Sequence, residues 1–182
     1  MERRVRSAGR GRHMVYQRTQ CQRQKFVRDA VCKDALRNRQ RAVCILGGGC
    51  GAVDAKTARP GSFRIVTDGD IKALEERLAK PKSAKFIIVD SYQYAYEAGW
   101  EYSLTKALIE RFKRKTFIFV SQEDKGKPIG KPAIRLKYAA GVKVRTQGFR
   151  AYCQGRYSGN VSEYYTIWAE KAVEVYNDKS NN

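Results

Sequence analysis

The feature that most constrains the fold is a pair of short apolar runs that each end in polar residues. The first run, Lys85 to Val89, leads into Asp90, and the second, Thr116 to Val120, leads into Ser121. Compact runs of this kind are typical of strands that are buried on both faces in a parallel sheet. Between them, Glu101 to Arg114 has the apolar spacing of a helix. The chain therefore alternates between strand and helix in this region.

The same alternation begins further upstream. Phe63 to Val66 has the composition of a short apolar strand, and Thr67 with Asp70 forms a capping-box pattern before a helix that Pro81 ends. The apolar positions of this helix share one face: Ile71, Leu74 and Leu78. Strand, helix, strand, helix and strand with short connections predict a doubly wound α/β sheet. In such sheets ligands lie beyond the carboxyl ends of the strands.

Beyond residue 120 the pattern changes to shorter segments rich in β-forming residues. We expect antiparallel strands that extend the sheet at residues 142–146, 149–153 and 164–168, followed by a polar tail at 177–182. The predicted fold class is therefore α/β, with a doubly wound, mainly parallel sheet and antiparallel C-terminal strands. We assign this core to residues 61–176.

Residues 1–60 form a basic segment of different character, which we expect to be poorly ordered or helical. Its helical periodicity is confined to Phe26 to Ala35, and a short strand at Arg41 to Leu46 precedes a glycine-rich turn. Residues 1–50 hold 13 of the chain's 37 Lys and Arg residues but only 3 acidic ones, and the formal net charge of the whole chain is +19. Such an excess of cations favours a polyanionic partner, above all nucleic acid.

The chain has the composition of a protein that folds in the cytoplasm. No apolar run approaches the length of about 18 residues that a membrane-spanning helix needs, so no membrane partner is expected. The arginine-rich start does not resemble a signal peptide, and the five cysteines are therefore expected to be reduced thiols.

Several stretches between residues 62 and 168 carry a resemblance to one family. The stretch from Phe63 to Ser91 resembles the strand, helix and Walker B strand of RecA-like P-loop ATPases, the superfamily of RecA, RadA and DnaB; it reads FRIVTDGDIKALEERLAKPKSAKFIIVDS. The next strand in that family is similar to TFIFVSQ, and the segment after its second DNA-binding loop is similar to IRLKYAAGVKVRT. A Lys-Asn-Arg-Phe-Gly motif of one branch is similar to QGRYSG, where Gln154 replaces the lysine.

The resemblance implies roles for four residues at the strand ends. Asp90 takes the position of the carboxylate that holds the water shell of Mg²⁺, and Gln122 that of the polar residue that senses the nucleotide. Ser91 and Ser121 accompany them, so ATP and Mg²⁺ are the implied cofactors. The alternative is structural: Asp90 as a strand end or helix cap, and Gln122 as a solvated strand end.

The loop from Glu123 to Lys131 is a candidate nucleic-acid contact, and single-stranded DNA is the partner we expect. Glycines make it flexible, and its cations suit a phosphate backbone, although an ordinary surface loop is the alternative. The residues assigned to this contact are Lys125, Lys127, Lys131, Arg135 and Arg156. Four nearby aromatic residues are expected in the core instead: Tyr92, Tyr94, Tyr96 and Trp100. The resemblance also implies a possible homo-oligomer.

The phosphate-binding loop of P-loop ATPases, Gly-x-x-x-x-Gly-Lys-Ser/Thr, does not occur in the sequence. The nearest approach is CGAVDAKT, in which Cys50 and Ala55 replace the two glycines that the turns of the loop require. Lys56 also precedes Asp90 by too few residues to leave room for the intervening strands and helices of the family. We therefore expect that the chain does not hydrolyse ATP alone.

Two interpretations of residues 1–60 remain open, namely a basic arm that binds nucleic acid and a frame-shifted or truncated reading of an ATPase gene. Three functions follow. The first is a RecA-like ATPase relative of DNA recombination, replication or a mobile element. The second is a non-catalytic nucleic-acid-binding module, and the third is an inactive copy of an ATPase.

Overall fold

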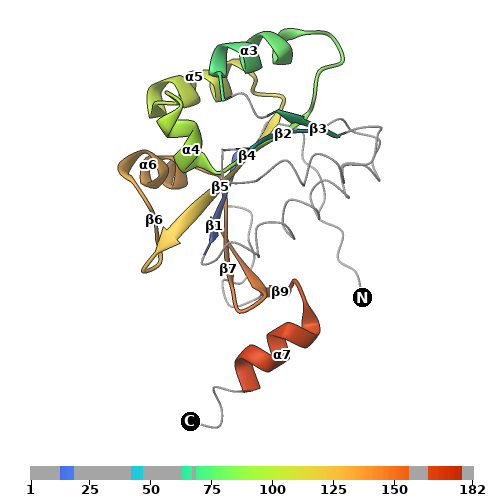
Figure 1. The fold of residues 1–182 in the computed structure, drawn as a ribbon, viewed down its shortest axis with the longest axis vertical. Helices are drawn as coiled ribbons and strands as arrows, with labels where there is room; N and C mark the ends of the chain where they lie inside the picture. The colour runs from blue at the N-terminus through green and yellow to red at the C-terminus, as the bar shows by residue number, and fades with distance from the viewer. Residues whose placement is uncertain (1–12, 19–41, 47–62, 67–68, 156–163, 178–182) are drawn as a thin grey trace.

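The fold is described here from a computed structural model, over residues 13–18, 42–46, 63–66, 69–155 and 164–177 (Figure 1). The described strands are β1 (His13–Arg18), β2 (Ala42–Leu46), β3 (Phe63–Val66), β4 (Phe86–Asp90), β5 (Thr116–Asp124), β6 (Lys127–Pro128), β7 (Val142–Gln147), β8 (Arg150–Gly155) and β9 (Tyr164–Thr166). The described helices are α3 (Ile71–Ala79), α4 (Tyr92–Glu97), α5 (Tyr102–Arg111), α6 (Lys131–Ala139) and α7 (Ala169–Asn177). The chain is an α/β protein, as the alternating pattern predicted.

The strands are ordered β3-β2-β4-β5-β1-β7-β8-β9, and β6 pairs with β5. β4, β5 and β6 form a mixed group, because β5 is parallel to β4 and antiparallel to β6. β7, β8 and β9 form an antiparallel group, so the antiparallel C-terminal strands are confirmed. β1 lies between the two groups and is parallel to both β5 and β7.

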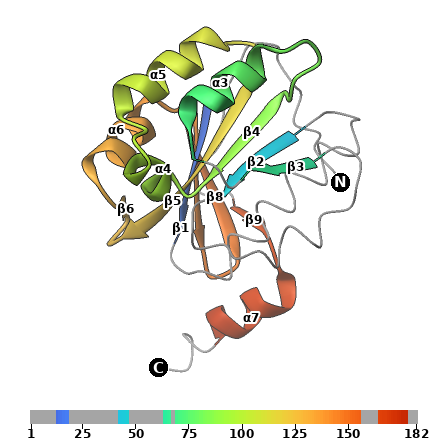
Figure 2. The same ribbon diagram turned by 45° about the horizontal axis from the view of Figure 1, so that its top comes forward.

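Helices α3, α4, α5 and α6 lie on one side of the strands (Figure 2). Their buried residues pack with alternate residues of β4 and β5, including Ile87, Phe117 and Phe119. Each large apolar side chain removed from water contributes about 1.5–3 kcal/mol, so this layer accounts for much of the stability. The intervening residues of the same strands, Ile88 and Ile118, are also buried, which agrees with strands covered on both faces.

The connection after β4 is held by two buried aromatic residues. Trp100 is fully buried and its indole Nε1 donates to the backbone oxygen of Gly69 (2.6 Å). The hydroxyl groups of Tyr92 and Thr105 are hydrogen-bonded at 3.2 Å. Burial raises the pKa of the Tyr92 hydroxyl, so it stays protonated and the hydrogen bond is kept through neutral pH.

The prediction that all four nearby aromatic residues are core residues is wrong for two of them. Tyr94 and Tyr96 are 39% and 46% exposed. Both belong to the short helix α4, in which Tyr92 and Ala95 face inward. Tyr94 lies two residues from Tyr92 and so falls off this face. Tyr96 is exposed near the C-terminal end of this six-residue helix.

The N-terminal segment contributes a central strand, β1, that its composition did not predict. β1 occupies a central place between β5 and β7, so the expectation of a helical or poorly ordered segment does not hold for His13–Arg18. This strand has no long apolar run, and its position follows from pairing with strands more than 100 residues away in sequence. The strand expected at residues 41–46 is confirmed as β2, and the sheet therefore crosses the boundary expected at residue 60. The helical fragment at 26–35 lies outside the described residues.

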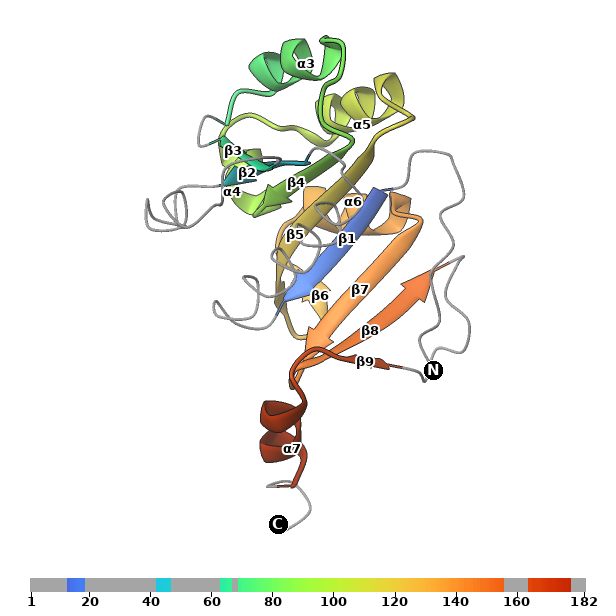
Figure 3. The ribbon, with the colours of Figure 1, turned by 90° about the vertical axis from the view of Figure 1, so that its right-hand side faces the viewer.

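Two C-terminal helices were also missed by the sequence analysis. One is α6, and the other is α7, which lies beyond the end of the β7–β9 strands (Figure 3). Arg150 joins α7 to the sheet, since its guanidinium carbon lies 3.7 Å from the ring centroid of Tyr176 and 4.1 Å from that of Tyr164. Among the described helices, α7 included, none has the length and apolar character that crossing a bilayer demands.

The segment that follows β5 differs from the flexible loop that the sequence predicted. The segment Glu123–Lys131 is not an irregular loop: β5 continues to Asp124, and a tight turn returns the chain to β6. Lys125 and Gly126 both have positive φ angles, of 47° and 83°, as two-residue hairpin turns require. Lys131 is the first residue of α6.

Two glycines with positive φ offer a test of the β7–β8 pairing. A Cβ atom at Gly155 (φ +139°) would lie 2.5 Å from the Gly141 oxygen, whereas a Cβ at Gly99 (φ +94°) would meet nothing within 4 Å. We expect Gly99→Ala to lower the free energy of unfolding by about 1 kcal/mol through backbone strain, and Gly155→Ala by roughly 2–4 kcal/mol through strain and backbone overlap. Urea denaturation of both variants measures this difference. Equal losses would show that the close approach of β7 and β8 at Gly155 is incorrect.

Candidate functional site at the carboxyl ends of β4 and β5

Asp90 and Gln122 lie on the same face of the sheet, at the carboxyl ends of neighbouring parallel strands. Asp90 is the last residue of β4 and is paired with Val120 of β5. Gln122 is two residues further along β5, and side chains two residues apart on a strand share a face. The structure therefore places these two predicted residues on one face of neighbouring strands, with Gln122 two residues beyond the register partner of Asp90.

The order of the strands reverses next to this site, at β1, which is the neighbour of β5. From β1 the chain passes to β2 and β3 on one side of β1. It then returns through β4 and β5 and reaches β7 on the other side of β1. Open α/β sheets bind ligands beyond the carboxyl ends of the strands at such a reversal. β1 ends here too, because Arg18 is paired with Gln122.

Asp90 and Ser91 are both buried. They are 2% and 4% exposed, and the peptide bond between them is cis. Ser91 is the N-cap residue of α4, yet its side chain makes no capping hydrogen bond. Its Oγ has no hydrogen-bond partner within the part of the chain that the structure describes. A buried hydroxyl therefore lies next to a buried carboxylate.

Ser121 belongs to the opposite face. It alternates with Gln122 along β5, and it receives a hydrogen bond from Gln93 Nε2 on the helix-covered side (2.8 Å). Its own Oγ donates to the backbone oxygen of Gln122 (3.1 Å). The structure thus places Asp90 and Gln122 on one face and Ser121 on the other, where it orders the end of the strand, while Ser91 follows Asp90 as the N-cap of α4.

Gln93 is the site residue that sequence reasoning missed. Its Oε1 accepts from the backbone N–H of Gln122 (3.2 Å). Its Nε2 donates to Ser121 Oγ and to the backbone oxygen of Ile129 (3.0 Å). The Ile129 amide in turn donates to the Gln122 oxygen (3.0 Å). One amide side chain of α4 therefore joins the end of β5 to the return of the hairpin. No sequence pattern indicates this role, because Gln93 precedes its partners by 28 residues or more.

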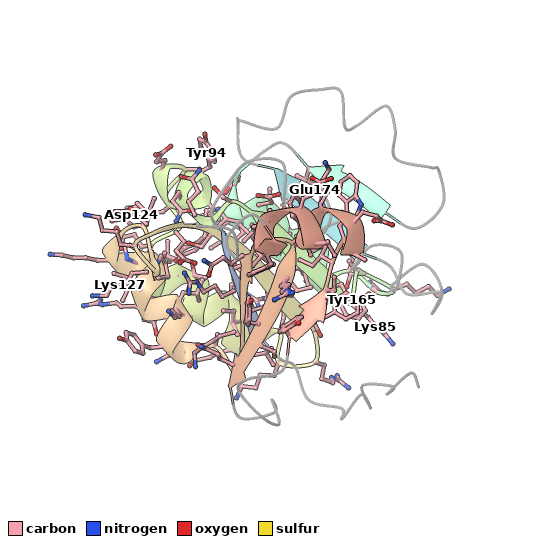
Figure 4. The ribbon with its side chains drawn as sticks, turned by 90° about the horizontal axis from the view of Figure 1, so that it is seen from below. Lys85, Tyr94, Asp124, Lys127, Tyr165 and Glu174 are labelled. Carbon is pink, nitrogen blue, oxygen red and sulfur yellow. The ribbon has the colours of Figure 1, made fainter. Side chains whose placement is uncertain are left out.

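The predicted nucleic-acid contacts form an exposed cationic surface. Lys125 and Lys127 are exposed in the hairpin, and Lys131 and Arg135 are exposed one helical turn apart on α6. Arg135 lies over the ring of Tyr102, 5.9 Å from its centroid. Figure 4 shows Lys127 and Asp124 on the same side of the molecule as Tyr94. Arg156 lies outside the described residues.

A further aromatic residue belongs to this surface. Tyr138, three residues after Arg135 on α6, is 79% exposed and was not assigned a role from the sequence. Residues three apart on a helix are neighbours, so an open aromatic ring lies beside the cations. Such a combination suits single-stranded nucleic acid, whose bases stack on rings while its phosphates meet cations.

A buried ion pair anchors the base of the hairpin. The Glu123 carboxylate is 1% exposed and accepts from Arg145 Nε of β7 at 3.0 Å. Burial lowers the pKa of the nearby Lys137 ammonium, and the Glu123 charge opposes this shift by favouring the charged form. The hairpin is thus tied to β7 as well as to α4.

Asp90 is the carboxylate at this edge that suits a metal. Among the residues that the structure describes, no three His, Cys, Asp or Glu side chains gather as a metal-ligand set. A Mg²⁺ ion in a nucleotide site does not need such a set, since it is bound through one or two carboxylates together with phosphates and water.

The comparisons with known proteins add no assignment. No protein-family model matches the chain, and no curated protein matches it.

Replacing Gln93 tests whether one side chain joins these elements. We expect Gln93→Ala to lower the free energy of unfolding by about 1–3 kcal/mol, since three hydrogen bonds are lost, and to speed hydrogen exchange at the Gln122 amide. Gln147→Ala removes a similar but exposed side chain and serves as the control. Unchanged exchange at Gln122 in the Gln93 variant would contradict the link.

Proposed function

We propose that the chain is a RecA-like ATPase-related protein that acts on nucleic acid in DNA recombination, replication or a mobile element, and that it does not hydrolyse ATP alone. The observation that carries this proposal is the placement of Asp90 and Gln122 on one face of two neighbouring central strands, next to a cationic hairpin. In this proposal the strand ends receive a nucleotide, and the hairpin with α6 receives single-stranded DNA.

The residues present at the strand ends fit a magnesium nucleotide. Asp90 would hold the water shell of the metal, and the Ser91 hydroxyl, which has no partner among the described residues, supplies a second oxygen beside it. When bound, Mg²⁺ neutralises charge on the phosphates. The Gln122 amide group, on the same face, would hydrogen-bond to the phosphate end of the nucleotide.

Two observations argue against hydrolysis by this chain alone. The sequence lacks a Gly-x-x-x-x-Gly-Lys-Ser/Thr loop, and its nearest approach, at residues 50–57, lies outside the described residues. Asp90 is also only 2% exposed, so a ligand reaches its carboxylate only if the groups that cover it move. Nucleotide binding should therefore be weak, because part of the binding energy is spent on this movement.

The hydrogen bonds of Gln93 would connect the two halves of the site. A ligand that shifts the end of β5 near Gln122 also shifts Gln93, and Gln93 is bonded to the oxygen of Ile129 in the segment that leads into α6. The nucleotide state and the position of the cationic surface would then be coupled through one side chain. Coupling of this kind requires only that the ligand favour one position of the hairpin.

A nucleic-acid-binding module without nucleotide is the second candidate. It is favoured by the difference in exposure between the two parts of the site, since the lysines of the hairpin are exposed whereas Asp90 is covered. The two experiments below separate these candidates, because one depends on Asp90 and the other on the lysines.

The first experiment measures nucleotide binding and turnover. We expect the wild-type chain to bind a fluorescent ATP analogue weakly and only with Mg²⁺, and to release no phosphate above background. Asp90→Asn should weaken this binding at least fivefold, since the carboxylate charge that holds the metal is lost. Asp124→Asn removes an exposed carboxylate from the neighbouring strand β5 and should have no effect. Turnover that depends on Asp90 would refute the claim that the chain does not hydrolyse ATP alone.

The second experiment measures binding of a 20-nucleotide oligo-dT over a range of salt concentrations. If Lys125 and Lys127 of the hairpin and Lys131 of α6 contact phosphates, Lys125→Gln/Lys127→Gln/Lys131→Gln should reduce the slope of log affinity against log salt by about 2, at roughly 0.7 per contact. The control, Lys72→Gln/Lys106→Gln/Lys171→Gln, removes the same charge from helix positions elsewhere, of which Lys72 and Lys106 are exposed and Lys171 is partly exposed. Equal slopes for the two triple variants would exclude the hairpin as the phosphate contact.

A further inference from the structure

A basic depression lies at the amino-terminal ends of β4 and β5, at the opposite edge of the sheet from Asp90. Its volume is about 680 Å³, and it is formed by the two turns that precede these strands. The residues that line it are Lys82, Ser83, Lys85, Glu110, Arg111, Phe112, Lys113, Arg114 and Lys115. No role was assigned to these residues from the sequence.

The two turns are held together by specific hydrogen bonds. Lys115 Nζ donates to Ser83 Oγ (2.6 Å) and to the Ala84 oxygen (2.8 Å). The Thr116 amide donates to the Lys85 oxygen (2.8 Å). The depression is therefore a defined structure and not a chance gap between mobile side chains.

The charge of the depression is strongly unbalanced. Six of its lining residues are Lys or Arg and one is acidic. Glu110 is paired with Lys106, and Arg111 is paired with Glu75. Five cations of the lining remain, and three of them, Lys85, Lys113 and Arg114, are exposed and have no acidic partner among the described residues. A surface of this kind attracts an anion with several charges.

Two further features favour an anion at this position. Lys82 has a φ of 58°, a conformation that residues with a side chain rarely adopt, so a cation is present where glycine would be less strained. Burial lowers the pKa of the Lys115 ammonium, and Lys115 retains a third N–H donor beyond its two bonds to the turn. A bound anion would favour the charged form of Lys115.

The depression is suited to phosphate groups and not to bases. Phe112 is its one aromatic lining residue, and Arg111 and Lys115 both lie over its ring, 5.8 Å from the centroid. The ring is thus already engaged and does not offer an open face for base stacking. Recognition therefore rests on the cations, which bind phosphate oxygens without regard to sequence.

We propose that this depression is a second phosphate-binding site, which takes the phosphates of a nucleic-acid backbone or of a free polyphosphate. It is separate from the hairpin, because the nine residues of β5 lie between them and span roughly 30 Å at about 3.3 Å per residue. Figure 4 likewise shows Lys85 and Lys127 far apart. The proposal does not depend on the function proposed above, which concerns the other edge of the sheet.

The test compares two variants of the full chain that each lose two positive charges. Lys113→Gln/Arg114→Gln alters the depression, and Lys72→Gln/Lys171→Gln removes two cations elsewhere. Lys113, Arg114 and Lys72 are exposed and Lys171 is partly exposed, so both variants should fold, which circular dichroism checks. Tripolyphosphate is titrated into each protein while amide chemical shifts are followed by NMR. We expect shifts at residues 83–85 and 113–116 in the wild type, and an affinity at least fivefold weaker in Lys113→Gln/Arg114→Gln only.

A second arm identifies the source of the phosphate. Binding of a 20-nucleotide oligo-dT is measured against salt, and loss of two backbone contacts should reduce the slope by about 1.4. A reduced slope in Lys113→Gln/Arg114→Gln assigns the site to nucleic acid, and loss of tripolyphosphate binding with an unchanged slope assigns it to a free polyphosphate. If the two variants behave alike in both arms, the proposal is wrong. If Lys125→Gln/Lys127→Gln/Lys131→Gln reduces the oligo-dT slope while Lys113→Gln/Arg114→Gln changes neither the slope nor the tripolyphosphate affinity, the proposed function is supported and this inference is overturned.

Discussion

The parallel pairing of β4 with β5 is the constraint on which the rest of the structure depends. It aligns Asp90 with Val120, so that Gln122 follows on the same face and the last residues of β5 extend beyond the end of β4. A shift of one residue would turn every side chain of one strand to the other face, and the buried aromatic rings of β5 would lose the helices they pack against. The register is therefore held by the core, and the candidate site inherits its geometry from that core.

Much of this pairing could be predicted from the sequence because it is encoded locally. The runs around Ile87 and Phe117 are apolar at every position, and only a strand covered on both faces uses such a pattern. Helix α3 was predicted from its apolar spacing, and its N-cap proved to be Asp70, whose side chain accepts from the Lys72 amide (2.9 Å). Elements with strong periodicity and a clear end were the ones that sequence reasoning found.

The features that escaped prediction depend on contacts between distant parts of the chain. β1 has a mixed composition, and its place in the sheet follows from its neighbours β5 and β7. Gln93 resembles any polar helix residue until the fold brings it to Ser121 and Ile129. Ser121 and Asp90 lie on opposite faces of the sheet because side chains alternate between the two faces at the end of β5. Alternation along a strand places Ser121 and Gln122 on opposite faces in any register, so this separation follows from the strand itself.

β5 connects two cationic regions that lie at opposite ends of the strand. Its first residue follows a basic turn, and its last residues form a hairpin that carries exposed lysines, while its middle is buried among apolar side chains. A buried strand in the middle of a sheet does not stretch, so the spacing between the two cationic regions is set by the strand. Beyond its backbone pairing with β5, the hairpin is held mainly through Gln93 and the Glu123–Arg145 ion pair. A ligand that displaces any part of this strand should therefore act at the carboxyl edge, where Asp90 and Gln122 lie, because the turns at the amino edge are tied to each other.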